Sequence, residues 1–231
     1  MASKPRYKIV SDNSSFHATW KCHNDDWFLK WKWAKQLYLD LLQKYSPKYG
    51  VVFHSYNFMD NHPHLIGKIG KREDFSSMFR DVNSVFAKRV NKVLGRSGQV
   101  IKDRMKTPEI QTDEHMLNAM VYADLNQCRA GKRKRPEHND YSSYNHYAYG
   151  KKTPLVKPCE TYMALGKTAK QRQRNYKRLV YSMLERNYYI NISDTYFIGD
   201  PLWVLRRYEE LRGAVRRKRR DNLSNINAPP P

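Results

Sequence analysis

The hydrophobic pattern of the sequence switches between a period of two and a period of about 3.6, and the order of the switches limits the folds open to the chain. Residues 14–22 alternate apolar and polar side chains, as in a half-buried strand, and the apolar positions of 27–45 recur at helical spacing. The predicted order is strand, helix, strand, strand, helix and, after a loop, helix. These elements cover residues 14–22, 27–45, 51–59, 64–69, 74–95 and 112–131.

Two histidines and a tyrosine helix carry the chemical information in this pattern. His62 and His64 lie two residues apart in an extended run, so their imidazoles point to the same side. Tyr122 and Asn126 lie four residues apart in a predicted helix and share one face. Two imidazoles and an amide oxygen can hold a divalent ion, and a phenol one turn away can attack a phosphodiester. His62, His64 and Asn126 are therefore candidate metal ligands, with Tyr122 as the candidate nucleophile.

Each of these pairs also has a purely structural interpretation. The chain contains 8 His and 17 Tyr, so chance pairs at these spacings are common and most tyrosines will serve packing or the surface. His115 lies two turns before Tyr122 on nearly the same face, which makes it an alternative ligand or proton acceptor.

The charge of the chain points to the class of partner. The formal net charge is +21, from 43 Lys and Arg against 22 Asp and Glu, which favours a polyanionic partner. Nucleic acid is the first candidate and a membrane surface is the rival. No apolar run approaches the roughly 20 residues of a spanning helix, and the N-terminus leads into no signal-peptide apolar region. We therefore expect a cytoplasmic, nucleoid-associated protein that binds nucleic acid and no membrane.

Basic residues gather after the predicted tyrosine helix and again in the helix predicted after Thr168. Charge runs of this kind are often only solvated helix surface. Aromatic residues make up 13% of the chain and many lie among basic ones, which suits base stacking, although packing explains most of them equally well. The residues expected to contact DNA are Arg104, Arg129, Lys132, Arg133, Lys134, Arg135, Arg172 and Arg174.

Three segments, in the same order, resemble the signatures of REP-associated tyrosine transposases. Residues 56–66, YNFMDNHPHLI, resemble the family's "lMpNHvHll". Residues 122–131, YADLNQCRAG, resemble "Yi.lNPvrAG", and residues 140–150, DYSSYNHYAYG, resemble "dy.wSSy..y.G". A looser match makes residues 96–104 a short strand beside the active site.

The resemblance implies a fold and a division of the chain. The fold would be ferredoxin-like α+β, an antiparallel sheet with helices packed on one face and the metal site facing the tyrosine helix. Residues 1–150 would form the catalytic domain, 151–221 a basic helical extension that binds DNA, and 222–231 a disordered tail.

The resemblance also implies an activity. Tyr122 would cleave and rejoin single-stranded or hairpin DNA through a 5′-phosphotyrosine intermediate, with Mg²⁺ or Mn²⁺ held by His62, His64 and Asn126. The protein would act as a monomer or a homodimer. Two rival classes remain. A catalytically inactive DNA- or RNA-binding derivative would keep the charge and fold, and a metal-dependent nuclease that uses water would keep the histidines but form no covalent adduct.

The chain departs from the family pattern at two positions. Gln127 replaces the usual Pro after Asn126, which should be tolerated because the helix continues a little further. Pro63 replaces the usual bulky apolar residue between the histidines, and it cannot donate to a sheet ladder because it lacks an N–H.

Overall fold

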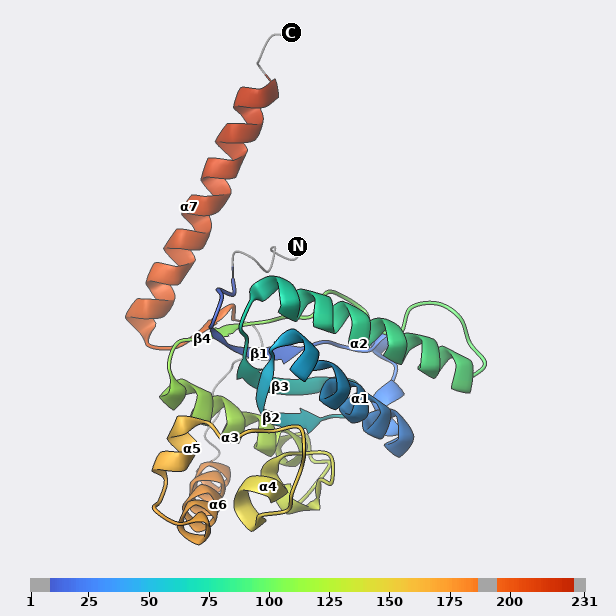
Figure 1. Ribbon diagram of the computed structural model, residues 1–231, viewed down its shortest axis with the longest axis vertical. Helices are drawn as coiled ribbons and strands as arrows, with labels where there is room; N and C mark the ends of the chain where they lie inside the picture. The colour runs from blue at the N-terminus through green and yellow to red at the C-terminus, as the bar shows by residue number, and fades with distance from the viewer. Residues whose placement is uncertain (1–8, 187–194, 227–231) are drawn as a thin grey trace.

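The computed structural model of the protein describes residues 9–186 and 195–226, except for the side chains of Asp113 and of 214–226. A sheet lies at its centre, helices surround the sheet, and one long helix projects from the body (Figure 1). The elements are β1 (Ser15–Thr19), α1 (Lys32–Tyr45), β2 (Val52–Phe58), β3 (Pro63–Lys68), α2 (Arg72–Val93), β4 (Glu109–Ile110), α3 (Asp113–Arg129), α4 (Tyr144–Tyr149), α5 (Glu160–Ala164), α6 (Ala169–Glu185), β5 (Phe197–Ile198) and α7 (Pro201–Ile226).

The sheet confirms the predicted α+β class. Its strand order is β2-β3-β1-β4-β5, and every pairing is antiparallel except that of β4 with β5. The first four strands with α1 and α2 form a βαββαβ unit, the ferredoxin-like arrangement. In the register, Thr19 of β1 and Asn57 of β2 both lie opposite His64 of β3, so all three residues share one face of the sheet.

Helices α1 and α2 cover the first face of the sheet. Phe16 of β1 lies 4.7 Å from Phe75 of α2 between ring centroids, and both side chains are fully buried. Tyr38 of α1 packs on Phe58 of β2 at 5.8 Å and on Phe86 of α2 at 5.0 Å. The helical stripes predicted over 27–45 and 74–95 are core in their central parts, whereas Trp27, Trp31 and Val93 at their ends are exposed.

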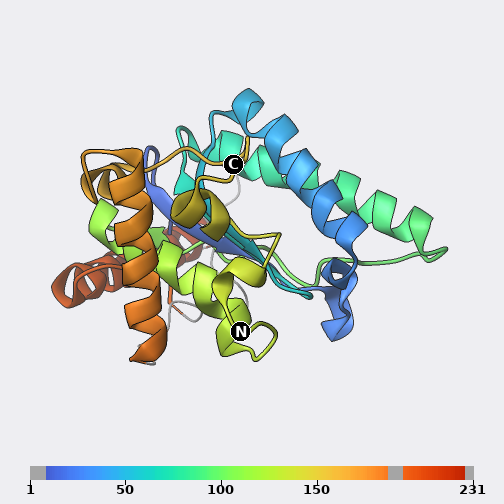
Figure 2. The same cartoon turned by 90° about the horizontal axis from the view of Figure 1, so that it is seen from below.

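Helix α3 covers the opposite face, so the expectation of helices on one face only is wrong. Figure 2 shows the sheet between α1 and α2 on one side and α3 on the other. Asn57 donates to the carbonyl of Ala123, and Gln127 donates to the carbonyl of Phe58 at 3.0 Å, so two side chains fix α3 on the sheet. The face needs a cover because Ile66 and the neutral imidazole of His64 point into it and would otherwise expose apolar surface.

The segment after residue 150 shares the core of the preceding residues. Helix α6, predicted to follow Thr168, begins with a capping box at that residue and packs on α3 and α4. The hydroxyl of Tyr176, a fully buried side chain, donates to Asp124 of α3 at 2.7 Å. The stretch between α4 and α6 contains α5 and a bridge from Val156 to Phe53. The predicted extension is thus continuous in packing with the sheet domain.

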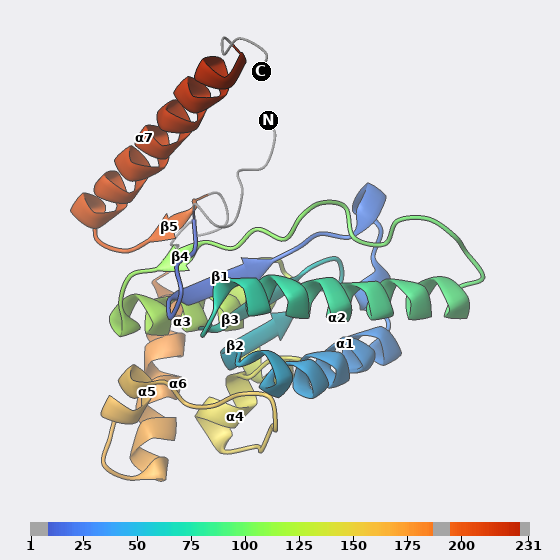
Figure 3. The ribbon, with the colours of Figure 1, turned by 45° about the horizontal axis from the view of Figure 1, so that its top comes forward.

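The C-terminal helix is anchored at its start and then leaves the body. Strand β5 pairs with β4, and Arg207 of α7 bonds to Glu109 of β4 at 2.6 Å. Beyond this anchor α7 projects away from the sheet (Figure 3). Helix α7 reaches Ile226, within the stretch predicted as a disordered tail, and residues 227–231 lie outside the described residues.

The short strand predicted at 96–104 is absent, and this part of the chain forms a loop. The side chain of Gln99 donates to the carbonyls of Ile101 and Lys102, both at 2.7 Å, so the segment folds back on itself. A single bridge from Ile101 to Cys22 is its pairing with the β1 region. The fourth strand forms instead at Glu109–Ile110, which pairs with β1 on one side and β5 on the other.

Candidate functional site

Three histidines meet on the sheet face under α3. His64 lies on β3, His62 precedes this strand, and His17 lies on the neighbouring strand β1. The Nε2 atoms of His62 and His64 are 3.1 Å apart, and Nδ1 of His64 is 2.9 Å from Nε2 of His17. The expectation that His62 and His64 point to the same side is confirmed. His17 was not predicted as part of a site.

Burial keeps the three imidazoles neutral. Desolvation, with a smaller contribution from His62, lowers the pKa of His17 to about 3. Desolvation, assisted by the charge of Lys21, lowers the pKa of His62 to about 4. The pKa of His64 is well below its ordinary value, again because of burial. Neutral imidazoles have free lone pairs, which is the state that metal binding requires.

The spacing of two ring nitrogens fits a pair of metal ligands. Two ligands at right angles around an octahedral ion, each about 2.1 Å from it, are about 3.0 Å apart, close to the 3.1 Å between His62 and His64. Nδ1 of His62 lies 2.6 Å from the acceptor oxygen of Asn61, so its proton is on Nδ1 and its lone pair on Nε2. No group of three His, Cys, Asp or Glu among the described residues could hold a metal, so a third ligand from this part of the chain would be of another kind.

Pro63, between the histidines, leaves the strand intact. It is the first residue of β3 and lies opposite Phe58 at the end of β2. At the end of a strand the missing N–H does not interrupt the ladder. The doubt that Pro63 raised about the local geometry is thereby removed.

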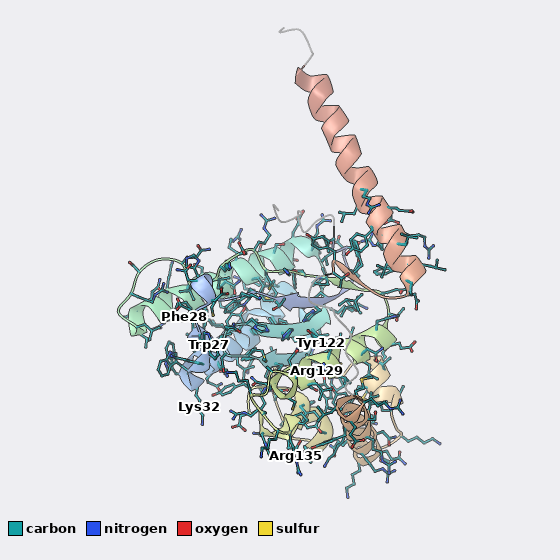
Figure 4. The ribbon with its side chains drawn as sticks, turned by 180° about the vertical axis from the view of Figure 1, so that it is seen from behind. Trp27, Phe28, Lys32, Tyr122, Arg129 and Arg135 are labelled. Carbon is teal, nitrogen blue, oxygen red and sulfur yellow. The ribbon has the colours of Figure 1, made fainter. Side chains whose placement is uncertain are left out.

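Tyr122 lies against the histidines. Thr112 caps α3, and three turns later the Tyr122 ring approaches His64 at 5.8 Å and His17 at 6.4 Å between centroids, edge to face in both cases. Only 5% of the tyrosine is exposed. The guanidinium of Arg129 lies 5.5 Å from the Tyr122 ring and donates to its carbonyl, so a cation accompanies the phenol (Figure 4). Residues far apart in the sequence thus form one cluster.

Asn126 and His115, the other two candidate ligands on α3, have different surroundings. Asn126 follows Tyr122 by one turn of α3, and its Nδ2 atom is buried without a hydrogen-bond partner. Turning this amide over would place Oδ1, a metal-ligand type of oxygen, at the same position. His115 bonds through Nδ1 to Thr112 at 2.8 Å and lies 3.8 Å from Asp200. His115 therefore belongs to the helix cap and not to the histidine cluster.

The segment of residues 140–150 supports α3 from the edge of the sheet. The Ser143 N–H donates to the carbonyl of Tyr56 at 2.9 Å, and the hydroxyls of Ser143 and Ser55 lie 2.9 Å apart. Asn139 donates to Asn57 at 2.9 Å, and Asn57 in turn bonds to α3. This third motif therefore has a positioning role behind the site.

A basic and aromatic surface follows α3. Lys132 lies 4.3 Å above the ring of Trp27, which is 46% exposed and sits beside Phe28 (Figure 4). Sequence reasoning did not single out Trp27, whose spacing matched the core stripe of the next helix. Five of the predicted DNA contacts are exposed, one in the loop before β4 and four just after α3. They are Arg104, Lys132, Arg133, Lys134 and Arg135.

Arg129 lies beside Tyr122, and the last two predicted DNA contacts, Arg172 and Arg174, lie on another part of the molecule. Arg172 donates to the carbonyls of Gly166 and Lys167, which ties it to the start of α6, whereas Arg174 is exposed. Helix α6 packs on the side of α3 that carries Asp124, about 200° around the helix from Tyr122. The structure does not group these two arginines with the histidines. Among the described residues, no helix is long and apolar enough to cross a membrane.

Comparison with known proteins identifies the fold. The chain superimposes on a REP-associated tyrosine transposase bound to a REP hairpin, with a TM-score of 0.54 and 16% identity, over 69% of this chain and 93% of that one. A candidate transposase from Deinococcus radiodurans R1 aligns over 58% of this chain and 98% of that one at 14% identity, but its TM-score of 0.37 carries no argument. No family model matches the sequence, and no curated relative matches it.

Proposed function

We propose that the protein is a metal-dependent single-tyrosine transposase, which cleaves and rejoins single-stranded DNA through Tyr122. The contact of the Tyr122 ring with His64, a residue 58 positions earlier in the chain, carries this proposal. A phenol packed against a neutral imidazole pair that is spaced for a divalent ion has few plain structural explanations. The shared fold with a REP-associated tyrosine transposase supports the same assignment.

In the proposed reaction, the hydroxyl oxygen of Tyr122 attacks a phosphodiester phosphorus. The bond from phosphorus to the 3′ oxygen breaks, leaving a 5′-phosphotyrosine and a 3′-hydroxyl that has gained a proton. A second 3′-hydroxyl can reverse the step on another strand, so rejoining needs no nucleotide cofactor. Tyrosine has an ordinary pKa of about 10 and needs a neighbouring cation to react at neutral pH. Arg129 beside the ring supplies one such cation.

His62 and His64 would hold a Mg²⁺ or Mn²⁺ ion, with Asn126 as a third ligand through its amide oxygen. Mixed imidazole and amide ligation suits Mn²⁺ at least as well as Mg²⁺. When bound, the ion would polarise the non-bridging oxygens of the scissile phosphate. The protein residues would orient the strand and exclude water from the phenol.

The proposed substrate is single-stranded DNA next to a hairpin. The net charge of +21 favours a polyanion. Exposed Trp27 under Lys132 offers a stacking surface with a cation, the combination found in proteins that bind single strands. The similar transposase was solved with a REP hairpin, and we infer a related DNA ligand for this chain.

A gel assay separates this proposal from its rivals. Protein, an end-labelled single-stranded hairpin oligonucleotide and Mn²⁺ are incubated and run under denaturing conditions. A transposase gives a slow covalent band that disappears in Tyr122→Phe and persists in Tyr141→Phe, a partly buried tyrosine on the neighbouring loop. Shortened DNA without the slow band identifies a water-using nuclease. DNA binding without either product identifies an inactive derivative, and both results would refute the proposal.

A further inference from the structure

His17 makes a specific contact that none of the sequence motifs includes. Its side chain is fully buried on β1, an inner strand of the sheet. Its Nε2 atom lies 2.9 Å from Nδ1 of His64, with the two ring planes within 6° and the centroids 5.1 Å apart. Because the nitrogens are much closer than the centroids, the coplanar rings meet edge to edge. That is the geometry of an in-plane hydrogen bond between imidazoles.

The contact bears on which nitrogen of His64 carries the proton. Nδ1 of His64 faces His17, and Nε2 faces His62 at 3.1 Å. A neutral imidazole has one N–H, so His64 can donate to one neighbour only. A proton on Nε2 would point into the space between His62 and His64 and block a cation. A proton on Nδ1 leaves the Nε2 lone pair free.

We propose that His17 is a positioning residue that holds His64 in its metal-binding tautomer. Nε2 of His17 accepts a hydrogen bond from the Nδ1–H of His64, which turns the Nε2 lone pair of His64 toward a divalent cation shared with His62. This inference rests on the metal site of the proposed function. Metal-binding histidines usually donate their second N–H to a fixed acceptor. Asn61 is that acceptor for His62, and His17 is that acceptor for His64.

Two features favour this role over simple packing. Nδ1 of His17 is buried with no hydrogen-bond partner, so among the described residues His64 is the one hydrogen-bonding contact of the ring. A buried imidazole with a single polar contact is costly compared with an apolar side chain of similar size. In addition, both proposed acceptors are uncharged, so neither places a negative charge beside an anionic DNA strand.

The test is a calorimetric Mn²⁺ titration of the full chain and three variants. His17→Gln places an amide oxygen near the position of the imidazole Nε2, whereas His17→Phe fills a similar volume without an acceptor. His54→Phe is the matched control, because His54 is also buried in the sheet and bonds through Nδ1 to the Lys157 carbonyl at 2.7 Å. We expect His17→Phe to weaken Mn²⁺ binding about 10- to 100-fold. The Mn²⁺ affinities of His17→Gln and of the control His54→Phe should both stay close to that of wild type.

A second measurement reads the tautomer directly. Nitrogen NMR of histidine-labelled wild-type protein with Mg²⁺ should show the His64 proton on Nδ1. The inference is overturned if that proton is on Nε2, if His17→Phe binds Mn²⁺ as tightly as wild type, or if His17→Gln loses as much affinity as His17→Phe. Should His17→Phe fail to fold, the glutamine variant and the tautomer decide. If the wild type binds no Mn²⁺, the metal site of the proposed function fails and the inference with it.

Discussion

Replacing Asp124 by asparagine should change how the stability of the protein depends on pH. Asp124 is 1% exposed, between α3, α6 and the loop of Ser142. Ser142 donates to one of its carboxyl oxygens at 2.9 Å and Tyr176 donates to the other at 2.7 Å. Burial raises the pKa of Asp124 from 3.8 to about 7, and the two hydrogen bonds offset only part of this rise.

The size of the effect follows from the two pKa values. Between about pH 4 and pH 7 the folded protein keeps the proton of Asp124 and the unfolded chain releases it. Stability from this group is therefore fully present below about pH 4 and is lost as the pH rises through the folded pKa. Each pH unit corresponds to about 1.4 kcal/mol, so the loss approaches about 4 kcal/mol by pH 8. An asparagine amide cannot ionise, so Asp124→Asn removes this loss.

The assay is urea unfolding of both proteins at pH 4.5, 6 and 8. The unfolding free energy of Asp124→Asn minus that of wild type should rise by about 3 kcal/mol from pH 4.5 to pH 8, because about 1 kcal/mol of the total is already lost at pH 4.5. The buried histidines act in the opposite direction, since their lowered pKa values cost stability as the pH falls, but they cancel in the difference. Asp140→Asn, at a side chain that is 71% exposed, is the control and should track wild type. A difference in unfolding free energy that does not change with pH would show that Asp124 of α3 is not buried beneath α6.

Three further predictions concern the proposed site and the DNA surface. His62→Ala or His64→Ala should lose Mn²⁺ binding in calorimetry without loss of fold, because each removes one of two imidazole ligands. Unchanged Mn²⁺ affinity in both variants would show that the two histidines serve only in packing. Trp27→Ala should weaken single-strand binding by about 1–3 kcal/mol in an anisotropy titration, whereas Tyr149→Ala, equally exposed at 46% beneath Lys177, should not. Deleting 214–231, which carries five Lys and Arg, should flatten the plot of log DNA affinity against log salt concentration. The slope should fall by about 0.7 for each lost contact with a single strand. An unchanged slope would exclude this segment from DNA contact.

The elements that depend on local pattern could be predicted from the sequence. The alternation in 14–22 and the helical periodicity of the three main helices depend on near neighbours in the chain, and the structure has these elements. The shared direction of His62 and His64 follows from the period of a strand in the same way.

Features that depend on pairing between distant strands could not be predicted. The alternation of β1 assigned His17 to its polar side, and only the pairing of His17 with Ile66 shows that this side is the buried floor of the site. The resemblance implied helices on one face of the sheet, and no local pattern in the sequence indicates that Asn57 and Gln127 fix α3 on the other face. The segment 96–104 makes a bridge with Cys22 instead of the expected strand, and Gln99 binds the carbonyls of Ile101 and Lys102 from within the segment.

The C-terminal segment shows a related limit. Its charge suggested a basic helical extension that binds DNA, and no local pattern showed that Tyr176 and Val180 of α6 are fully buried in the core shared with the preceding residues. Cutting the chain near Thr168 would therefore remove core side chains and leave Asp124 without one of its two donors. A truncation that tests the tail alone has to begin after the anchored start of α7.

Identifying the tyrosine that becomes attached to DNA tests the central claim most directly. The covalent product formed with Mn²⁺ and a single-stranded hairpin oligonucleotide is digested with nuclease and trypsin and analysed by mass spectrometry. Cleavage after Lys106 and Arg129 yields residues 107–129, in which Tyr122 is the single tyrosine. We predict that this peptide carries the nucleotide phosphate. A nucleotide on the peptide that contains Tyr141 and Tyr144, or cleaved DNA with no modified peptide, would contradict the assignment of Tyr122 as the nucleophile.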